Sequence, residues 1–144
     1  MTSRKMARLA ALIGVWNTTG VVLETAASPA TTLAGSDTYR WLPGEYFMVH
    51  EVDVCFGTTP SRSMEVIGHD ASSDGYMAHS YNDQGTIEQS EFALHGHQLR
   101  ITAPTARFLG TFNAAGNELT GLWELHAPQT GWQPWIELKL VRAD

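Results

Sequence analysis

The chain has 144 residues, a length typical of one domain, which we expect to span residues 1–144. With 43% hydrophobic and 17% charged residues, the composition excludes a disordered chain. Nine basic against fifteen acidic residues give a net charge of −6, which disfavours nucleic acid as a partner, because nucleic-acid binding depends on clustered Lys and Arg.

The first segment, residues 3–13, has the spacing of a short helix. Thr2 or Ser3 is its expected N-cap, and Gly14 its stop. Its apolar residues recur at helical spacing, at Met6, Leu9, Ala10 and Ile13. We expect this to be the only helix of the chain.

The early apolar run, residues 9–15, raises the question of a membrane. The run is too short to span a bilayer, and no small-residue cleavage site of a signal peptide precedes Trp16. The single Cys55 excludes an internal disulfide framework and fits a reducing compartment. We therefore expect a cytoplasmic protein without a membrane span, in which Cys55 is a plain wall or surface residue.

From Gly14 onward, alternating apolar stretches are separated by turn residues about every ten positions. Such regular spacing predicts an all-β antiparallel meander that closes into an up-and-down barrel of about eight to ten strands, wide enough to hold one small ligand. The expected strands are 16–25, 33–41, 45–56, 62–69, 76–81, 86–94, 98–102, 107–112, 118–126 and 132–142.

Residues 45–56 alternate most clearly. Successive side chains of a strand point to opposite faces, so one face of this strand is apolar along its length. That face carries Tyr46, Met48, His50, Val52, Val54 and Phe56. His50 is its only group that titrates near neutral pH, which predicts an imidazole in an otherwise apolar barrel wall.

Other strands show the same pattern with varying clarity. Apolar residues occupy alternate positions at Leu119, Trp123 and Leu125, at Ile136, Leu138 and Leu140, and at Phe108 and Phe112. Tyr39 and Trp41 share their face with Asp37. In residues 62–69 the set of Met64, Val66 and Gly68 is favoured only narrowly over Glu65, Ile67 and His69, and residues 76–81 and 86–94 are polar on both faces.

A family resemblance is carried by ordered motifs along nearly the whole chain. They are Gly14-Val15-Trp16, Trp41-Leu42-Pro43-Gly44, His69-Asp70, Gly121-Leu122-Trp123 and Trp132-Gln133-Pro134-Trp135. The chain resembles the DUF1579-like bacterial proteins, within the lipocalin and fatty-acid-binding-protein group of calycin-type barrels. The resemblance implies that Trp16 closes one end of the barrel, but it brings no settled activity.

The nitrobindin-like branch of the same fold binds haem through a histidine near the C-terminus. In this chain Thr18 replaces the middle glycine of the opening motif of that branch, and residues 132–142 contain no histidine. His126 is the nearest substitute, at the end of the preceding strand. The resemblance therefore keeps haem or nitric-oxide binding as an alternative, although the histidine that would ligate the haem iron is absent from the last strand.

The remaining motifs carry little chemistry. His95 and His97 flank Gly96 in a turn and no third ligand at zinc-like spacing follows, so we expect no metal and no cofactor. His69 next to Asp70 is interpreted as a surface pair. No Gly-x-Ser-x-Gly, phosphate loop or dinucleotide fingerprint supports a hydrolase or a nucleotide-binding protein.

The sequence thus predicts a barrel that binds a small hydrophobic molecule. The candidate ligand-binding residues are Tyr39, Arg40, Trp41, Met48, His50, Met64, Phe108 and Trp123. His50 and Arg40 would orient the ligand by hydrogen bonds. One alternative is a cofactor-independent isomerase or cyclase with His50 as catalytic acid or base; another is a filled barrel that acts through its surface, in which His50 is a hydrogen-bonded core residue. The oligomeric state stays open between a monomer and a homodimer.

Overall fold

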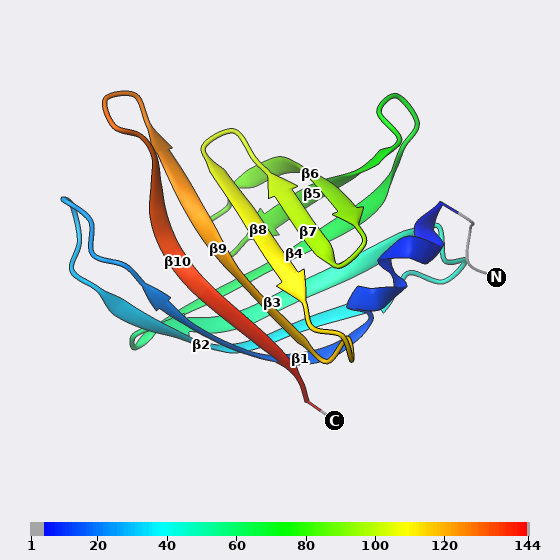
Figure 1. Ribbon diagram of the computed structural model, residues 1–144, viewed down its shortest axis with the longest axis horizontal. Coiled ribbons are helices and arrows are strands. Elements are labelled where there is room, and N and C mark those ends of the chain that lie inside the picture. Colours follow the sequence, from blue (N-terminus) through cyan, green and yellow to red (C-terminus); the bar gives the residue numbers. More distant parts are fainter. Residues whose placement is uncertain (1–4, 144) are drawn as a thin grey trace.

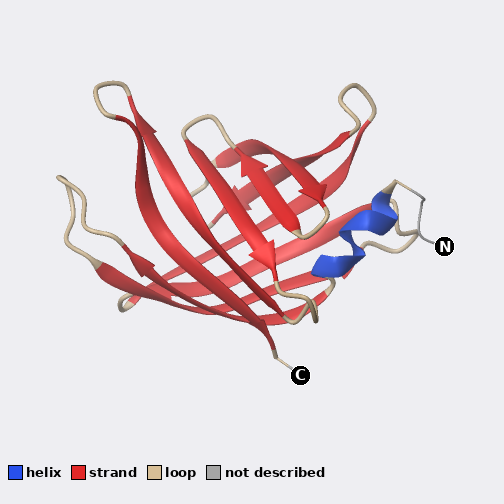
Figure 2. Cartoon of the chain, viewed as in Figure 1, coloured by secondary structure: helices blue, strands red, loops and turns tan. Residues whose placement is uncertain are grey.

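A computed structural model describes residues 5–143, which form an all-β antiparallel barrel of ten strands with one short helix (Figures 1 and 2). This confirms the predicted fold class, and the architecture matches a calycin-like barrel. Each predicted strand is present, with ends that differ by a few residues. The strands are β1 (Gly14–Val22), β2 (Thr31–Trp41), β3 (Phe47–Phe56), β4 (Thr59–Asp70), β5 (Gly75–Asn82), β6 (Ile87–His95), β7 (Gln98–Thr102), β8 (Ala106–Phe112), β9 (Glu118–Ala127) and β10 (Gly131–Arg142).

The barrel closes in the simplest way for a meander. Each strand pairs with its neighbours in the sequence, and β1 pairs with both β2 and β10. Closure removes the free sheet edges that would otherwise expose unpaired backbone groups. Because consecutive strands run in opposite directions, alternate turns gather at each end. The β1–β2, β3–β4, β5–β6, β7–β8 and β9–β10 turns lie at the end away from the helix, which we call the open end.

The helix closes the other end. It is a 3₁₀ helix over Met6–Leu12, which lies within the short helix that the sequence predicts for residues 3–13; the predicted N-caps Thr2 and Ser3 lie outside the described residues. Met6, Leu9 and Leu12 are fully buried at its inner side, because residues three apart align along a 3₁₀ helix. In the described part of the chain, no helix is long and apolar enough to cross a membrane.

Arg142, from the end of β10, fastens the helix to the barrel. Its guanidinium donates to the carbonyl oxygens of Ile13 at 2.6 Å and Ala11 at 2.7 Å, and it lies 4.3 Å from the centre of the Trp16 ring. Trp16 is completely buried, and its indole N–H donates to the Leu12 carbonyl oxygen at 2.8 Å. These contacts confirm the placement of Trp16 at the closed end.

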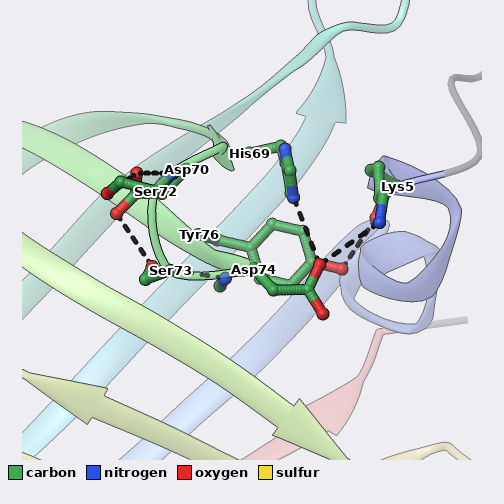
Figure 3. A network of polar contacts seen from close by, with 8 residues as sticks. Lys5, His69, Asp70, Ser72, Ser73, Asp74 and Tyr76 are labelled. Atoms are coloured by element: carbon green, nitrogen blue, oxygen red, sulfur yellow. Dashed lines mark hydrogen bonds and ion pairs between the residues drawn. The ribbon is translucent and has the colours of Figure 1, made fainter.

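The start of the helix is held by the β4–β5 hairpin (Figure 3). The Lys5 ammonium lies 3.2 Å from an Asp74 carboxylate oxygen, and the Tyr76 hydroxyl donates to the Lys5 carbonyl oxygen at 2.7 Å. The ion pair is exposed and contributes little stability, whereas Tyr76 is buried. Tyr76 is therefore the main attachment at this end of the helix.

The neighbouring His69–Asp70 pair does not form a dyad. The Asp70 carboxylate accepts hydrogen bonds from Ser72 and Ser73, as Figure 3 shows. His69 Nε2 lies 3.6 Å from Asp74 and makes no hydrogen bond. Asp70 thus stabilises its own turn, while His69 contacts Tyr76 edge-on.

The inward faces follow the predicted alternation in most strands. Met48, His50 and Val54 of β3 are buried, whereas Tyr46 precedes the strand and is 66% exposed, so its predicted place on the inner face is wrong. The predicted inner set of β4 is also wrong. Glu65 lies directly opposite His50, and residues directly opposite on paired strands share a face. Ile67, two residues further along, is fully buried.

Candidate functional site

A cavity of about 320 Å³ lies inside the barrel and extends toward the open end, where Asn82 and Thr86 flank the β5–β6 turn. Its two sides differ in chemistry. The polar wall, from β2 to β6, presents Asp37, His50, Ser61, Ser63, Glu65, Ser80, Asn82, Glu88 and Ser90, interspersed with Tyr39, Val52, Met64 and Phe92. The apolar wall, from β7 to β10 with the adjoining residue 103, presents Leu99, Ile101, Ala103, Phe108, Leu119, Trp123, Leu138 and Leu140.

One row of the polar wall crosses five strands at the same height. Tyr39 lies opposite His50, His50 opposite Glu65, Glu65 opposite Ser80, and Ser80 opposite Glu88. Adjacent members of such a row point to the same face. The antiparallel register therefore brings an imidazole, two carboxylates, a phenol and a hydroxyl together, although they span fifty residues of sequence.

His50 is held between two carboxylates. Its Nε2 lies 2.6 Å from Asp37 Oδ2, and its Nδ1 lies 2.6 Å from Glu65 Oε1. Only 10% of the His50 side chain is exposed, and both carboxylates are almost as deeply buried. Carboxylate oxygens only accept hydrogen bonds, so each ring nitrogen has to carry a proton to make both contacts.

The protonation state follows from competing effects. Burial, the largest single influence, lowers the pKa of His50, but the hydrogen bonds and charges of Asp37 and Glu65 together raise it from 6.5 to about 9. The ring is therefore a cation at neutral pH and donates from both nitrogens. Buried charges are stable only when paired in this way.

Two further side chains complete the network. The Thr18 hydroxyl of β1 donates to the second oxygen of Asp37, and the Tyr39 ring stacks on the His50 ring with centroids 3.9 Å apart and planes 8° apart. Burial, followed by the negative charges of Asp37 and Glu65, raises the pKa of Tyr39 well above its usual value. Tyr39 is thus a neutral phenol that covers one face of the imidazolium.

The apolar wall is built by close packing. Phe108 lies over Gly110 and Gly121, where an added Cβ would come within 2.5 Å of the Phe108 ring. Gly110 and Gly121 lie opposite each other on β8 and β9. Because neither has a side chain, the Phe108 ring can pack directly on the backbone of both strands. Trp123 packs against that ring at 5.3 Å between centroids, and both rings face the cavity.

Five of the eight predicted ligand-binding residues line the cavity: Tyr39, His50, Met64, Phe108 and Trp123. Met64 does so from the edge, because it lies opposite Glu51 on the outward set and is 39% exposed.

The other three lie elsewhere. Met48 belongs to the packed core, and the partly buried Trp41 packs against that core. Arg40 points outward and pairs with Glu51 at 2.8 Å, so the expectation that it orients a ligand inside is wrong. Alternation explains the error, because Arg40 follows the inward Tyr39 by one position.

Most residues of the polar wall are not among the candidate residues that the sequence predicts. Asp37 carried a usable signal, because it shares a face with Tyr39 and Trp41. Glu65 was assigned to the wrong face, and Ser80 and Glu88 lie in strands whose two faces are equally polar. The strand register relative to His50 shows that Glu65, Ser80 and Glu88 face inward, which the sequence does not indicate.

The other histidines do not approach the cavity. His126, the nearest substitute for a haem ligand, is exposed and contacts Trp132 edge-on, and both nitrogens of His50 are already bound. The described residues therefore do not fit haem ligation as in the nitrobindin-like branch. Among residues 5–143, no group of three or more His, Cys, Asp or Glu side chains could hold a metal ion.

Comparison with known proteins supports the fold. The crystal structure of Rv2717c from M. tuberculosis is similar to this barrel with a TM-score of 0.75, over 100% of both chains and at 13% sequence identity. No family model matches the chain, and no curated protein matches it. At this identity the likeness shows a shared barrel fold.

Proposed function

We propose that this protein binds a small, largely apolar molecule inside its barrel. The observation that carries the proposal is the cavity of about 320 Å³ between an apolar and a polar wall. Ligand sites of proteins are concave, mostly apolar and equipped with a few convergent polar groups, and their volumes begin at about 300 Å³. A barrel filled with side chains would offer no such space.

The geometry favours binding over acid–base chemistry at His50. Both ring nitrogens are bound to carboxylates at 2.6 Å, so an isomerase or cyclase mechanism through His50 would first have to break a buried ion pair. In our proposal His50 acts as a positioning residue. It fixes Asp37 and Glu65 and thereby gives the polar wall a defined shape before the ligand arrives.

Filling the cavity tests this function. Ser63 lines the cavity from β4, and Ser63→Phe should occupy part of it. Binding of 1-aminoanthracene, a small neutral fluorophore, should weaken at least about tenfold, a loss of about 1.4 kcal/mol. The matched control is Gln89→Phe, which adds the same ring to an exposed position of β6 and should leave the affinity unchanged.

Thermal unfolding of both variants establishes that they are folded. Equal affinities of folded Ser63→Phe and wild-type protein would contradict binding in this cavity. A loss that is the same in both variants would contradict it too, because the side chain at the control position lies on the outer face of the barrel.

A further inference from the structure

The charged groups that face the cavity carry more negative than positive charge. They are Asp37, His50, Glu65 and Glu88, that is, three carboxylates and one imidazolium. The single positive charge is already shared by Asp37 and Glu65. The part of the cavity beyond this ion-pair network therefore has a negative potential.

No lysine or arginine among the described residues lines the cavity. Arg40, Arg62 and Arg107 are directed outward and pair there with Glu51, Asp53 and Glu124, respectively. Arg100 is exposed, and Arg142 is bound to the helix at the closed end. A ligand carboxylate inside the barrel would find no free cation. It would also lie close to Glu65 and Glu88, and like charges at short range are repulsive in a partly buried site.

Glu88 is an exposed residue that lines the cavity, and its carboxylate is the one best placed for a ligand. It lies in the same row as Glu65, with Ser80 between them. The Ser80 hydroxyl donates to the backbone oxygen of Glu88 at 3.2 Å, which leaves the carboxylate of Glu88 without a hydrogen bond or ion pair in the described structure. Glu88 can thus accept from a donor group that enters the cavity.

The opposite wall determines the orientation of the ligand. Phe108, the ring face of Trp123 and the aliphatic side chains of β7, β9 and β10 make this side mainly apolar, with the Trp123 indole N–H as the one side-chain donor among its described residues. The hydrophobic body of a ligand therefore belongs on that side. Its polar group is then directed toward Ser80 and Glu88. The cavity is complementary to an amphipathic molecule with one cationic end.

From this arrangement we infer that the natural ligand is a small amphipathic amine, whose protonated amino group lies at Glu88 and Glu65, and that the cavity discriminates against carboxylates. The inference rests on the proposed function and names its ligand class. It sets this barrel apart from one that binds the carboxylate of a fatty acid, since such a site needs a cation facing inward.

Three probes with one apolar body test the inference: 4-phenylbutylamine, 4-phenylbutanol and 4-phenylbutanoate. Isothermal titration at pH 7 measures their dissociation constants. The alkylammonium group is charged there, as the lysine side chain is. We expect the amine to bind at least about tenfold more tightly than the carboxylate, with the alcohol in between, and we expect added salt to weaken the amine alone.

A pair of variants locates the effect. Glu88→Gln removes the inward charge and keeps the shape of the side chain, and it should lower amine affinity about two- to fivefold, as expected for a partly exposed pair, while the alcohol is unaffected. Glu91→Gln is the control, because Glu91 is an exposed residue of the same strand on its outward set. It makes the same change in net charge and should leave all three probes unchanged.

The outcomes separate the two proposals. If the alcohol binds and the carboxylate binds as tightly as the amine, the inferred ligand class is wrong and the binding function stands. If Glu91→Gln weakens the amine as much as Glu88→Gln does, the preference comes from net charge and not from the cavity, which also overturns the inference. If none of the probes binds, the proposed function fails and the inference fails with it.

Discussion

The polar and apolar walls of the cavity are built by different means. On the apolar side, Phe108 rests on two glycines and packs against Trp123, so shape alone defines the surface. On the polar side, Asp37, His50 and Glu65 hold one another by short hydrogen bonds between opposite charges. The difference shows a division of tasks. The apolar wall is held by packing, whereas the polar wall is held by paired charges, which are stable in a buried place only when they are paired.

The largest expected effect is on the apolar core, which includes residues of the apolar wall. Trp16→Ala should lower the free energy of unfolding by about 3–5 kcal/mol, the range for removing a large buried aromatic side chain. Trp16 is completely buried, packs against Phe112 and supports the Arg142 guanidinium. Urea unfolding at pH 7 measures the loss.

Trp132→Ala is the control for this prediction, because Trp132 is only half-buried and lies outside the core clusters. It should cost clearly less than Trp16→Ala. A folded Trp16→Ala protein with an unchanged unfolding midpoint would contradict the account of the closed end.

A smaller effect concerns the polar wall, where the stability of the protein should depend on pH. The pKa of His50 is about 9 in the folded protein against a usual value of 6.5. A raised pKa gives stability that is fully present below pH 6.5 and is lost as the pH rises through 9. This contribution is up to about 3 kcal/mol, at 1.36 kcal/mol per pKa unit.

Unfolding experiments between pH 6 and 10 measure this loss. His50→Gln should be less stable at neutral pH, and the part of the slope due to His50 should vanish. His126→Gln alters an exposed histidine and should keep the wild-type slope. If His50→Gln unfolded with the same pH dependence as the wild type, the imidazolium between two carboxylates would be contradicted.

The comparison of the walls also explains what could be predicted from the sequence. The inward residues of β9 and β10, such as Leu119 and Leu140, follow from alternation because every second residue is apolar. His50 was found for the same reason, since its strand has an apolar face. The barrel and the ten strands follow from turn spacing together with that alternation.

Most of the polar wall could not be predicted in this way. A strand with Ser, Glu and His on both faces gives no sign of which face is buried, and a shift of one residue exchanges the two sets. That is why alternation favours Met64 over Glu65 for the inner face, although Glu65 binds His50. Placing Glu65 and Glu88 requires the register between strands, which depends on the closed barrel as a whole.

The most direct test of the central claim is to locate a bound neutral ligand by nuclear Overhauser effects. With 4-phenylbutanol bound to isotope-labelled protein, we expect contacts from the phenyl protons to Phe108 and Trp123, and from the hydroxymethyl protons to Ser80. These contacts would place the ligand across the cavity, between its two walls. Contacts confined to outward residues such as Gln89, or phenyl contacts to Ser80 with the hydroxymethyl group at Trp123, would contradict the account.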